Sequence, residues 1–198
     1  MNRHVVNSSD PDVARALQEY RAGNFERSIK LLRRCASQGS SEGMLFLANI
    51  YEWGAPGIPP DPVQAFELYV DLARDENLSA NLGLGRLYLY GRGVERDMRK
   101  ALQCFTLVES RGYASGQMMT TLGRMYEFGW GTEVDDKGAE HYYREANRMG
   151  NVYGRRYLGL FLKKKGRIFV GSFYVVSAAI RALLIGIKNP NDVRLNEM

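Results

Sequence analysis

The stretch LGRLYLYGRGVERD, residues 84–97, holds the first candidate for chemistry: two glycines with an arginine between them. Glycine-rich loops bind phosphates where they follow a strand and open a helix, because their backbone N–H groups then point at the ligand. The residues before Gly91 read as a helix, since their apolar side chains recur every three or four positions. The pattern therefore favours a connection between two helices over a phosphate site.

The other residues that could catalyse a reaction or bind a metal are few and scattered. His4, His141, Cys35 and Cys104 show no metal-ligand spacing, and two histidines are too few for a credible triad. Both cysteines lie in helical patterns, which favours buried, reduced thiols over a disulfide. The adjacent acids at 135–136 fit the start of a helix. We therefore expect no enzyme activity, no cofactor and no metal site.

The net charge of +5 comes from one end of the chain. Residues 1–162 hold 20 Lys plus Arg against 20 Asp plus Glu, whereas residues 163–198 hold 7 basic and 2 acidic residues. A balanced main body argues against a nucleic-acid partner. The opening MNRHVVNSSDPD contains no apolar run of a secretory signal, so we expect the protein to be cytoplasmic.

The sequence repeats itself at offsets of 37 and 38 residues. LANIYEWG starts at Leu47, LGRLYLYG at Leu84 and LGRMYEFG at Leu122. Five landmarks then recur in order: a glycine (Gly54, Gly91, Gly129), an aspartate (Asp61, Asp97, Asp135), an alanine (Ala65, Ala101, Ala139), an aromatic residue (Tyr69, Phe105, Tyr143) and a closing residue (Asn77, Gly112, Gly150). A period of this length is typical of stacked helix pairs.

Each landmark has a physical role in such a pair. The glycine ends the first helix at a positive φ. The aspartate caps the second helix, and in the first copy Pro62 fits its first position. The small alanine lets the two helices approach, and the aromatic side chain fills the space between them.

The pattern A-x3-LG-x2-Y-x2-G-x-GV-x2-D-x3-A-x3-Y/F-x6-G resembles the Sel-one-like repeat, a variant of the tetratricopeptide repeat with a longer inter-helix loop. LGRLYLYGRGVERDMRKALQCFTLVESRG matches almost throughout, and the copy from Leu122 has Thr132 in place of the valine. The copy from Leu47 departs more, with an inserted residue and the loop GAPGIPPD. Residues 16–39 resemble an ordinary tetratricopeptide pair. The resemblance covers about residues 12–165.

This resemblance implies an all-α fold: a right-handed superhelical solenoid of tetratricopeptide-like and Sel-one-like helix pairs with an atypical apolar C-terminal helix. We expect a flexible arm at 1–9, the solenoid at 10–165, the apolar helix at 166–190 and a loose tail at 191–198. Members of the family act mostly as adaptors that hold proteins or peptides. Bacterial relatives occur in exopolysaccharide control, signalling and secretion, and a eukaryotic relative is an adaptor in degradation at the endoplasmic reticulum.

The resemblance predicts a non-catalytic adaptor or scaffold that mediates protein–protein interaction. The alternative is a membrane-associated regulator of an envelope process, such as exopolysaccharide synthesis or secretion, that docks on a membrane enzyme. Positions between the landmarks are the candidates for contact with a partner in the solenoid groove: Asn49, Glu52, Arg86, Leu89, Arg124 and Glu127. The other interpretation is that these six are solvated surface residues.

The C-terminal segment breaks the repeat. Residues 168–187 contain a single charge, Arg181, and have the length of a membrane span. A narrow polar stripe at 167, 171, 174, 177, 181 and 188 leaves a broad apolar surface. The segment is thus a packed capping helix, a docking helix for a protein that could itself lie in a membrane, or a peripheral or tail anchor at the inner face of an anionic membrane. The docking candidates are Lys163, Lys164, Lys165, Arg167, Phe169, Phe173, Tyr174 and Arg181.

Overall fold

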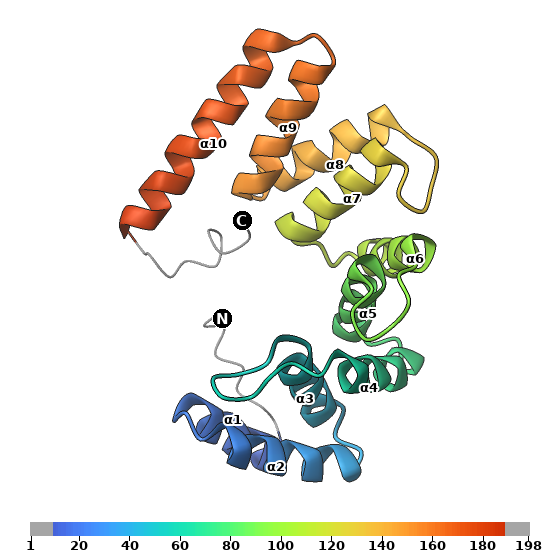
Figure 1. Cartoon of the computed structure of the whole chain (residues 1–198), viewed down its shortest axis with the longest axis vertical. Coiled ribbons are helices and arrows are strands. Elements are labelled where there is room, and N and C mark those ends of the chain that lie inside the picture. The colour runs from blue at the N-terminus through green and yellow to red at the C-terminus, as the bar shows by residue number, and fades with distance from the viewer. Residues whose placement is uncertain (1–9, 189–198) are drawn as a thin grey trace. The chain divides into compact units, whose positions relative to one another are not determined.

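The computed structural model describes residues 10–188, and every regular element in that range is an α-helix (Figure 1). The helices are α1 (Pro11–Arg21), α2 (Phe25–Ser37), α3 (Ser41–Trp53), α4 (Pro62–Arg74), α5 (Leu78–Tyr90), α6 (Met98–Ser110), α7 (Gly116–Phe128), α8 (Asp136–Arg148), α9 (Val152–Lys164) and α10 (Ile168–Lys188). The predicted arm at 1–9 and the predicted tail at 191–198 lie outside the described residues. The all-α helix-pair solenoid expected from the sequence is confirmed.

The described chain divides into two compact units, residues 10–111 and residues 112–188. The first unit contains the pairs α1–α2, α3–α4 and α5–α6, and each pair also packs on the next. The second unit contains α7–α8 and α9–α10, with α8 against α9. In both units the first helices of successive pairs also touch, α3 with α5 and α7 with α9. Each unit therefore buries its apolar side chains between neighbouring layers, as a stack of repeats does.

The predicted helix ends are confirmed at the recurring glycines and aspartates. The first helices end at glycines with positive φ, and the second helices begin after aspartates whose carboxylates accept backbone N–H bonds (Gly54, Gly91, Gly129; Asp61, Asp97, Asp135). The closing position of the first copy needs a correction. Glu76 takes the positive φ there, at 55°, and Asn77 instead caps α5 by accepting from the Ala80 N–H.

The recurring aromatic residues fill the space between paired helices, as predicted. Tyr69 and Tyr143 have no exposed surface, and Phe105 is buried with them. Phe105 lies against Gly85 and Tyr143 against Gly123, so close that a Cβ on either glycine would lie about 2.6 Å from the ring. At Gly85 and Gly123 the aromatic residue twenty positions later therefore leaves no room for a side chain.

The GRG loop at 91–93 is packed against protein. Gly91 and Gly93 both have positive φ, at 64° and 69°. A Cβ on Gly93 would come within 2.3 Å of the Pro62 carbonyl oxygen at the start of α4. No strand precedes the loop within residues 10–188, so the phosphate-loop arrangement is missing from this part of the chain. The loop instead joins one repeat to the preceding one.

Two glycine substitutions separate the need for a positive φ from the need for space. Gly39→Ala places a Cβ at φ 84° in open space, so the free energy of unfolding should fall by about 1 kcal/mol. Gly93→Ala adds the collision with Pro62, so the loss should reach about 3 kcal/mol. Urea unfolding followed by circular dichroism measures both. Equal losses would contradict the packing of this loop on α4.

Candidate functional site

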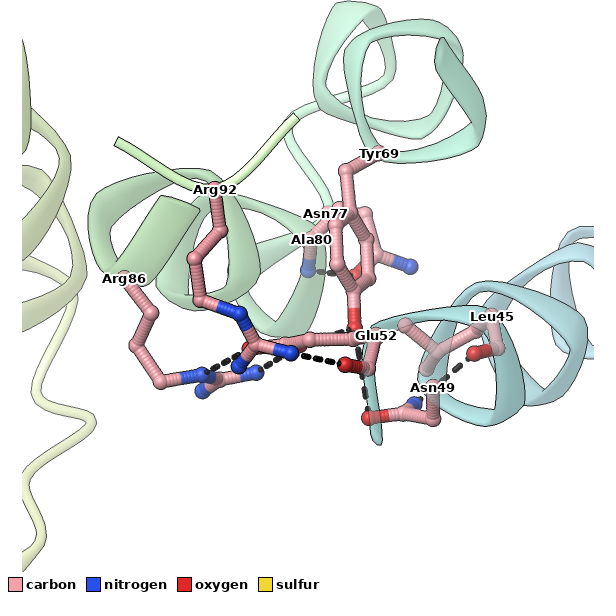
Figure 2. Close-up of polar contacts among 8 residues, drawn as sticks. All are labelled: Leu45, Asn49, Glu52, Tyr69, Asn77, Ala80, Arg86 and Arg92. Carbon is pink, nitrogen blue, oxygen red and sulfur yellow. Dashed lines mark hydrogen bonds and ion pairs between the residues drawn. The ribbon is translucent and has the colours of Figure 1, made fainter. Parts of the chain in front are cut away.

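The strongest polar cluster in residues 10–111 surrounds Glu52, at the C-terminal end of α3. The Glu52 side chain has no exposed surface. Its carboxylate accepts two hydrogen bonds from Arg86 of α5, from Nε at 2.7 Å and from Nη2 at 2.6 Å. The Tyr69 hydroxyl of α4 donates a third, at 2.8 Å (Figure 2). One carboxylate thus joins three helices that belong to two successive repeats.

The electrostatics of this cluster agree with its geometry. Burial, together with the adjacent Glu52 charge, raises the pKa of the Tyr69 hydroxyl far above its usual value, so the hydroxyl stays a donor. Burial alone would lower the pKa of the Arg86 guanidinium, but its hydrogen bonds to Glu52 and the carboxylate charge outweigh burial and raise it. Both partners of the Glu52 carboxylate therefore keep their protons across the physiological range.

The neighbouring side chains complete the enclosure of Glu52. The Asn49 amide donates to the Leu45 carbonyl at 2.8 Å, and its oxygen lies 3.3 Å from the Tyr69 hydroxyl. Arg92, from the GRG loop, donates to the Glu52 backbone carbonyl (Figure 2). The guanidinium groups of Arg86 and Arg92 both lie over the ring of Trp53, which is itself exposed. The arginine of the GRG loop is thus bonded to the preceding repeat.

A related cluster lies in residues 112–188. Glu127 of α7 accepts from the Tyr143 hydroxyl of α8 at 2.8 Å, as Glu52 does from Tyr69. Its second oxygen accepts from Lys164 of α9 at 3.2 Å. The Glu127 side chain is 9% exposed, so it too is almost enclosed. Burial and the Glu127 hydrogen bond raise the pKa of Tyr143, which keeps this hydroxyl protonated.

Arg124 differs from Arg86 although both occupy the same position in the repeat. The Arg124 guanidinium lies over two rings, 4.9 Å from the centroid of Trp130 and 5.2 Å from that of Tyr157. Its Nε is shielded from solvent and has no hydrogen-bond partner among the described residues. The sequence position that corresponds to Glu52 one repeat later is Leu89, which carries no carboxylate.

The six groove candidates therefore differ in the surface that they present. Glu52 and Leu89 are buried, and Glu127 is nearly so. Asn49 and Arg86 are half-buried and bonded within their own cluster. Arg124 is half-buried and holds the unpaired Nε. Partner contact by these residues stays a prediction, and Arg124 is the candidate with an unused donor.

Helix α10 packs on α9 through the middle of its polar stripe, at residues 171, 174 and 177. Gly171 approaches the backbone of Gly159, and Ser177 accepts from Arg155 Nε at 2.8 Å. Tyr174 packs on the aromatic cluster of α8 and α9, and Ala178 is buried. The opposite side of α10 exposes large apolar side chains: Ile168, Phe169, Val170, Phe173, Val176, Ile180, Leu183 and Leu184. We call these eight residues the α10 outer face.

The basic cluster beside α10 is largely paired within the fold. Lys164 pairs with Glu127, Lys165 with Asp136 and Arg167 with Glu140. Lys163 is exposed and makes no ion pair among the described residues. The exposed Arg181 lies beside Gly150, at the end of α8. The cluster therefore joins α9 and α10 to α7 and α8 and leaves few free charges.

The apolar part of α10, Ile168–Gly186, has a mean hydropathy of 2.0 and is long enough to cross a bilayer by length and composition. Only 17% of that stretch is buried, so it is not the core helix of a globular domain.

Sequence reasoning missed the pairing of Glu52 with Arg86. Aligning the copies pairs each residue with its equivalent, whereas in the fold the glutamate of one copy meets the arginine of the next. Their separation of 34 residues, close to one period, was the available signal. It also missed that the polar stripe of α10 would face α9.

Comparisons with known proteins agree with this geometry. The family model described as "Sel1 repeat" matches residues 41–70, 78–108 and 117–151. The chain is 30% identical over 142 residues to the ERAD-associated E3 ubiquitin-protein ligase component HRD3A of Arabidopsis thaliana, covering 66% of this chain and 21% of the relative. It thus spans about a fifth of that protein's length.

Two solved structures share the fold. A Sel1 repeat protein from Oxalobacter formigenes superposes with a TM-score of 0.72 at 19% identity, over 87% of this chain and 69% of the other. A putative sel1 repeat protein from Klebsiella pneumoniae subsp. pneumoniae gives a TM-score of 0.56 at 16% identity, over 89% and 88% of the two chains. At these identities the likeness concerns the fold alone.

Substitutions at Arg86 and Arg124 test whether the same arginine position has two different roles. Arg86→Met leaves the Glu52 charge buried without its cation, so the free energy of unfolding should fall by about 4 kcal/mol. Arg124→Met removes only ring contacts and should cost about 1 kcal/mol. Denaturant unfolding of both variants provides the comparison. Similar losses at the two positions would contradict the role assigned to Glu52.

Proposed function

The chain belongs to the Sel1-repeat family, and we propose that it is a non-catalytic adaptor that docks on a partner protein through the α10 outer face. Sel1 repeats mediate protein–protein interaction. The observation that carries the proposal is the orientation of α10. The middle of its polar stripe packs on α9, and its large apolar side chains face outward. Contiguous exposed apolar surface of this kind marks an interaction site.

The spacing within the outer face fits a helix as the contacting element. Phe169, Phe173, Val176, Ile180 and Leu183 follow one another at alternating steps of four and three residues. This is the a/d spacing with which two helices interlock side chains. Phe169 is 92% exposed and Phe173 is 64% exposed, so both are free to enter a partner surface. An apolar helix or groove, in a soluble protein or in a membrane protein, is the matching surface.

The second candidate is a membrane-associated regulator whose α10 enters or lies on a bilayer. Its length and mean hydropathy favour this candidate. Two observations favour docking on a protein. Three of the four basic residues beside α10 are paired with acids, which reduces the attraction to anionic headgroups. Spanning would also pull α10 away from α9, where Gly159 and Gly171 pack backbone to backbone.

Site-specific photo-crosslinking in cells should separate the two candidates. With benzoylphenylalanine in place of Phe173, we expect one discrete protein adduct, because this side chain is in the outer face. The adduct should vanish when Ile180→Ser and Leu183→Ser are added, since these changes remove the neighbouring contacts. The same probe in place of Tyr113, an exposed aromatic residue outside α10, should not give that adduct.

Fractionation completes the test. A chain that ends at Lys165 should remain helical and lose the partner. If the full chain instead sediments with membranes, resists salt extraction and is released only by detergent, and Phe173 yields no protein adduct, α10 is a membrane anchor and docking on a protein is wrong.

A further inference from the structure

We propose that the Arg124 guanidinium, which lies over the rings of Trp130 and Tyr157, is a binding site for a carboxylate of the partner protein. The inference rests on the proposed adaptor function and assigns the chemistry of a second contact, separate from α10. The site is built from α7, the loop after it and α9, all within residues 112–188.

The geometry fixes the guanidinium before any ligand arrives. The two rings lie 4.9 Å and 5.2 Å from the guanidinium carbon of Arg124. Tyr157 is itself stacked on the buried Tyr143, at a centroid distance of 6.0 Å and an angle of 12°. A planar cation held in this way loses little freedom when it forms paired hydrogen bonds.

The donors of this cation are incompletely used. Nε is shielded from water and lacks an acceptor among the described residues, which is a costly state for a buried N–H group. Arg124 is half-buried, and within the described residues Nε is the guanidinium nitrogen that is both buried and unpaired, so the Nη edge is the part open to the surface. A carboxylate from outside would bond the two Nη groups, because the shielded Nε lies out of its reach.

The chain itself indicates which acceptor fits. At the same repeat position, Arg86 holds a carboxylate through Nε and Nη2. In the sequence, the position one repeat after Glu52 is Leu89, which carries no carboxylate. Glu127, which occupies the repeat position of Glu52 in the second unit, already accepts hydrogen bonds from Tyr143 and Lys164. Arg124 thus occupies the repeat position of Arg86, and its Nε has no internal acceptor among the described residues.

The carboxylate has two chemical sources, an acidic side chain or the C-terminus of the partner. Both present two oxygens in the plane that a guanidinium matches. The probes are therefore a rhodamine-labelled, amidated peptide rich in glutamate, its glutamine counterpart, and that counterpart with a free C-terminal carboxylate. Binding is measured on the full chain by fluorescence anisotropy.

Substitution at Arg124 gives the decisive comparison. The glutamate peptide should bind the wild-type chain more tightly than the amidated glutamine peptide, and Arg124→Gln should weaken its binding about tenfold or more. Arg156→Gln removes the same charge from an exposed arginine of α9 and should change affinity less than about twofold. Arg124→Lys keeps the charge without the planar fork, so it should also bind weakly.

A second readout comes from the site itself. With Trp53→Phe, Trp130 is the remaining tryptophan of the chain, and its emission should change when the glutamate peptide binds. Circular dichroism and thermal melting confirm that each variant is folded. If the peptide with a free C-terminus binds as well as the glutamate peptide, and Arg124→Gln abolishes both, the site takes any carboxylate and the inference holds.

Equal weakening by Arg124→Gln and Arg156→Gln would overturn the inference, as would equal binding of all peptides. A wrong carboxylate site can be distinguished from a wrong adaptor proposal. Substitutions at Phe169 and Phe173 should leave peptide affinity unchanged, and the α10 adduct would persist if the carboxylate site alone were wrong.

Discussion

A carboxylate without exposed surface must be given charged and hydrogen-bonded partners, or the fold loses several kcal/mol. Glu52 is such a group, and its partners come from the second helix of its own repeat and from the first helix of the next. Tyr69 and Arg86 must therefore occupy fixed positions along α4 and α5 so that their side chains reach the carboxylate (Figure 2). The Glu52 carboxylate thus specifies the register between two repeats, a task that apolar contacts, being non-directional, perform less strictly.

The buried glutamate with its tyrosine and its cation recurs along the chain with changed partners. Glu127 keeps the tyrosine but takes Lys164 in place of an arginine. Arg124 keeps the arginine but has ring contacts in place of an acid. Helix α10 packs on α9 with the small and polar residues at 171, 174 and 177 and exposes its large apolar side chains. The exposed surface of the second unit thus includes an apolar helix face and a cation packed on two rings, the two features on which the proposals rest.

Much of the fold could be predicted because local physics determines it. The glycines and aspartates recur at fixed offsets, and each marks a helix end for a reason that acts within a few residues. The positive φ of Glu76 could not be predicted, because no sequence signal distinguishes a non-glycine residue that adopts it.

The site was less accessible from sequence. Ion pairs between α3 and α5, or between α9 and α7, depend on the rotation of one helix against another. The alternation of polar and apolar residues in α10 was visible, but not which side would meet α9, because the rule that apolar faces turn inward fails there. Arg124 and Arg86 occupy the same position in the repeat, but Arg86 bonds a carboxylate whereas Arg124 packs on two rings.

The central claim is that Glu52 and Arg86 are coupled across the boundary between repeats. A double-mutant cycle of Glu52→Gln and Arg86→Gln, followed by urea unfolding, measures that coupling directly. The account predicts a coupling free energy of about 2 kcal/mol or more, because the pair is bidentate and largely shielded from water. Additive effects, with a coupling below about 0.5 kcal/mol, would show that the repeats are held in register by apolar packing alone.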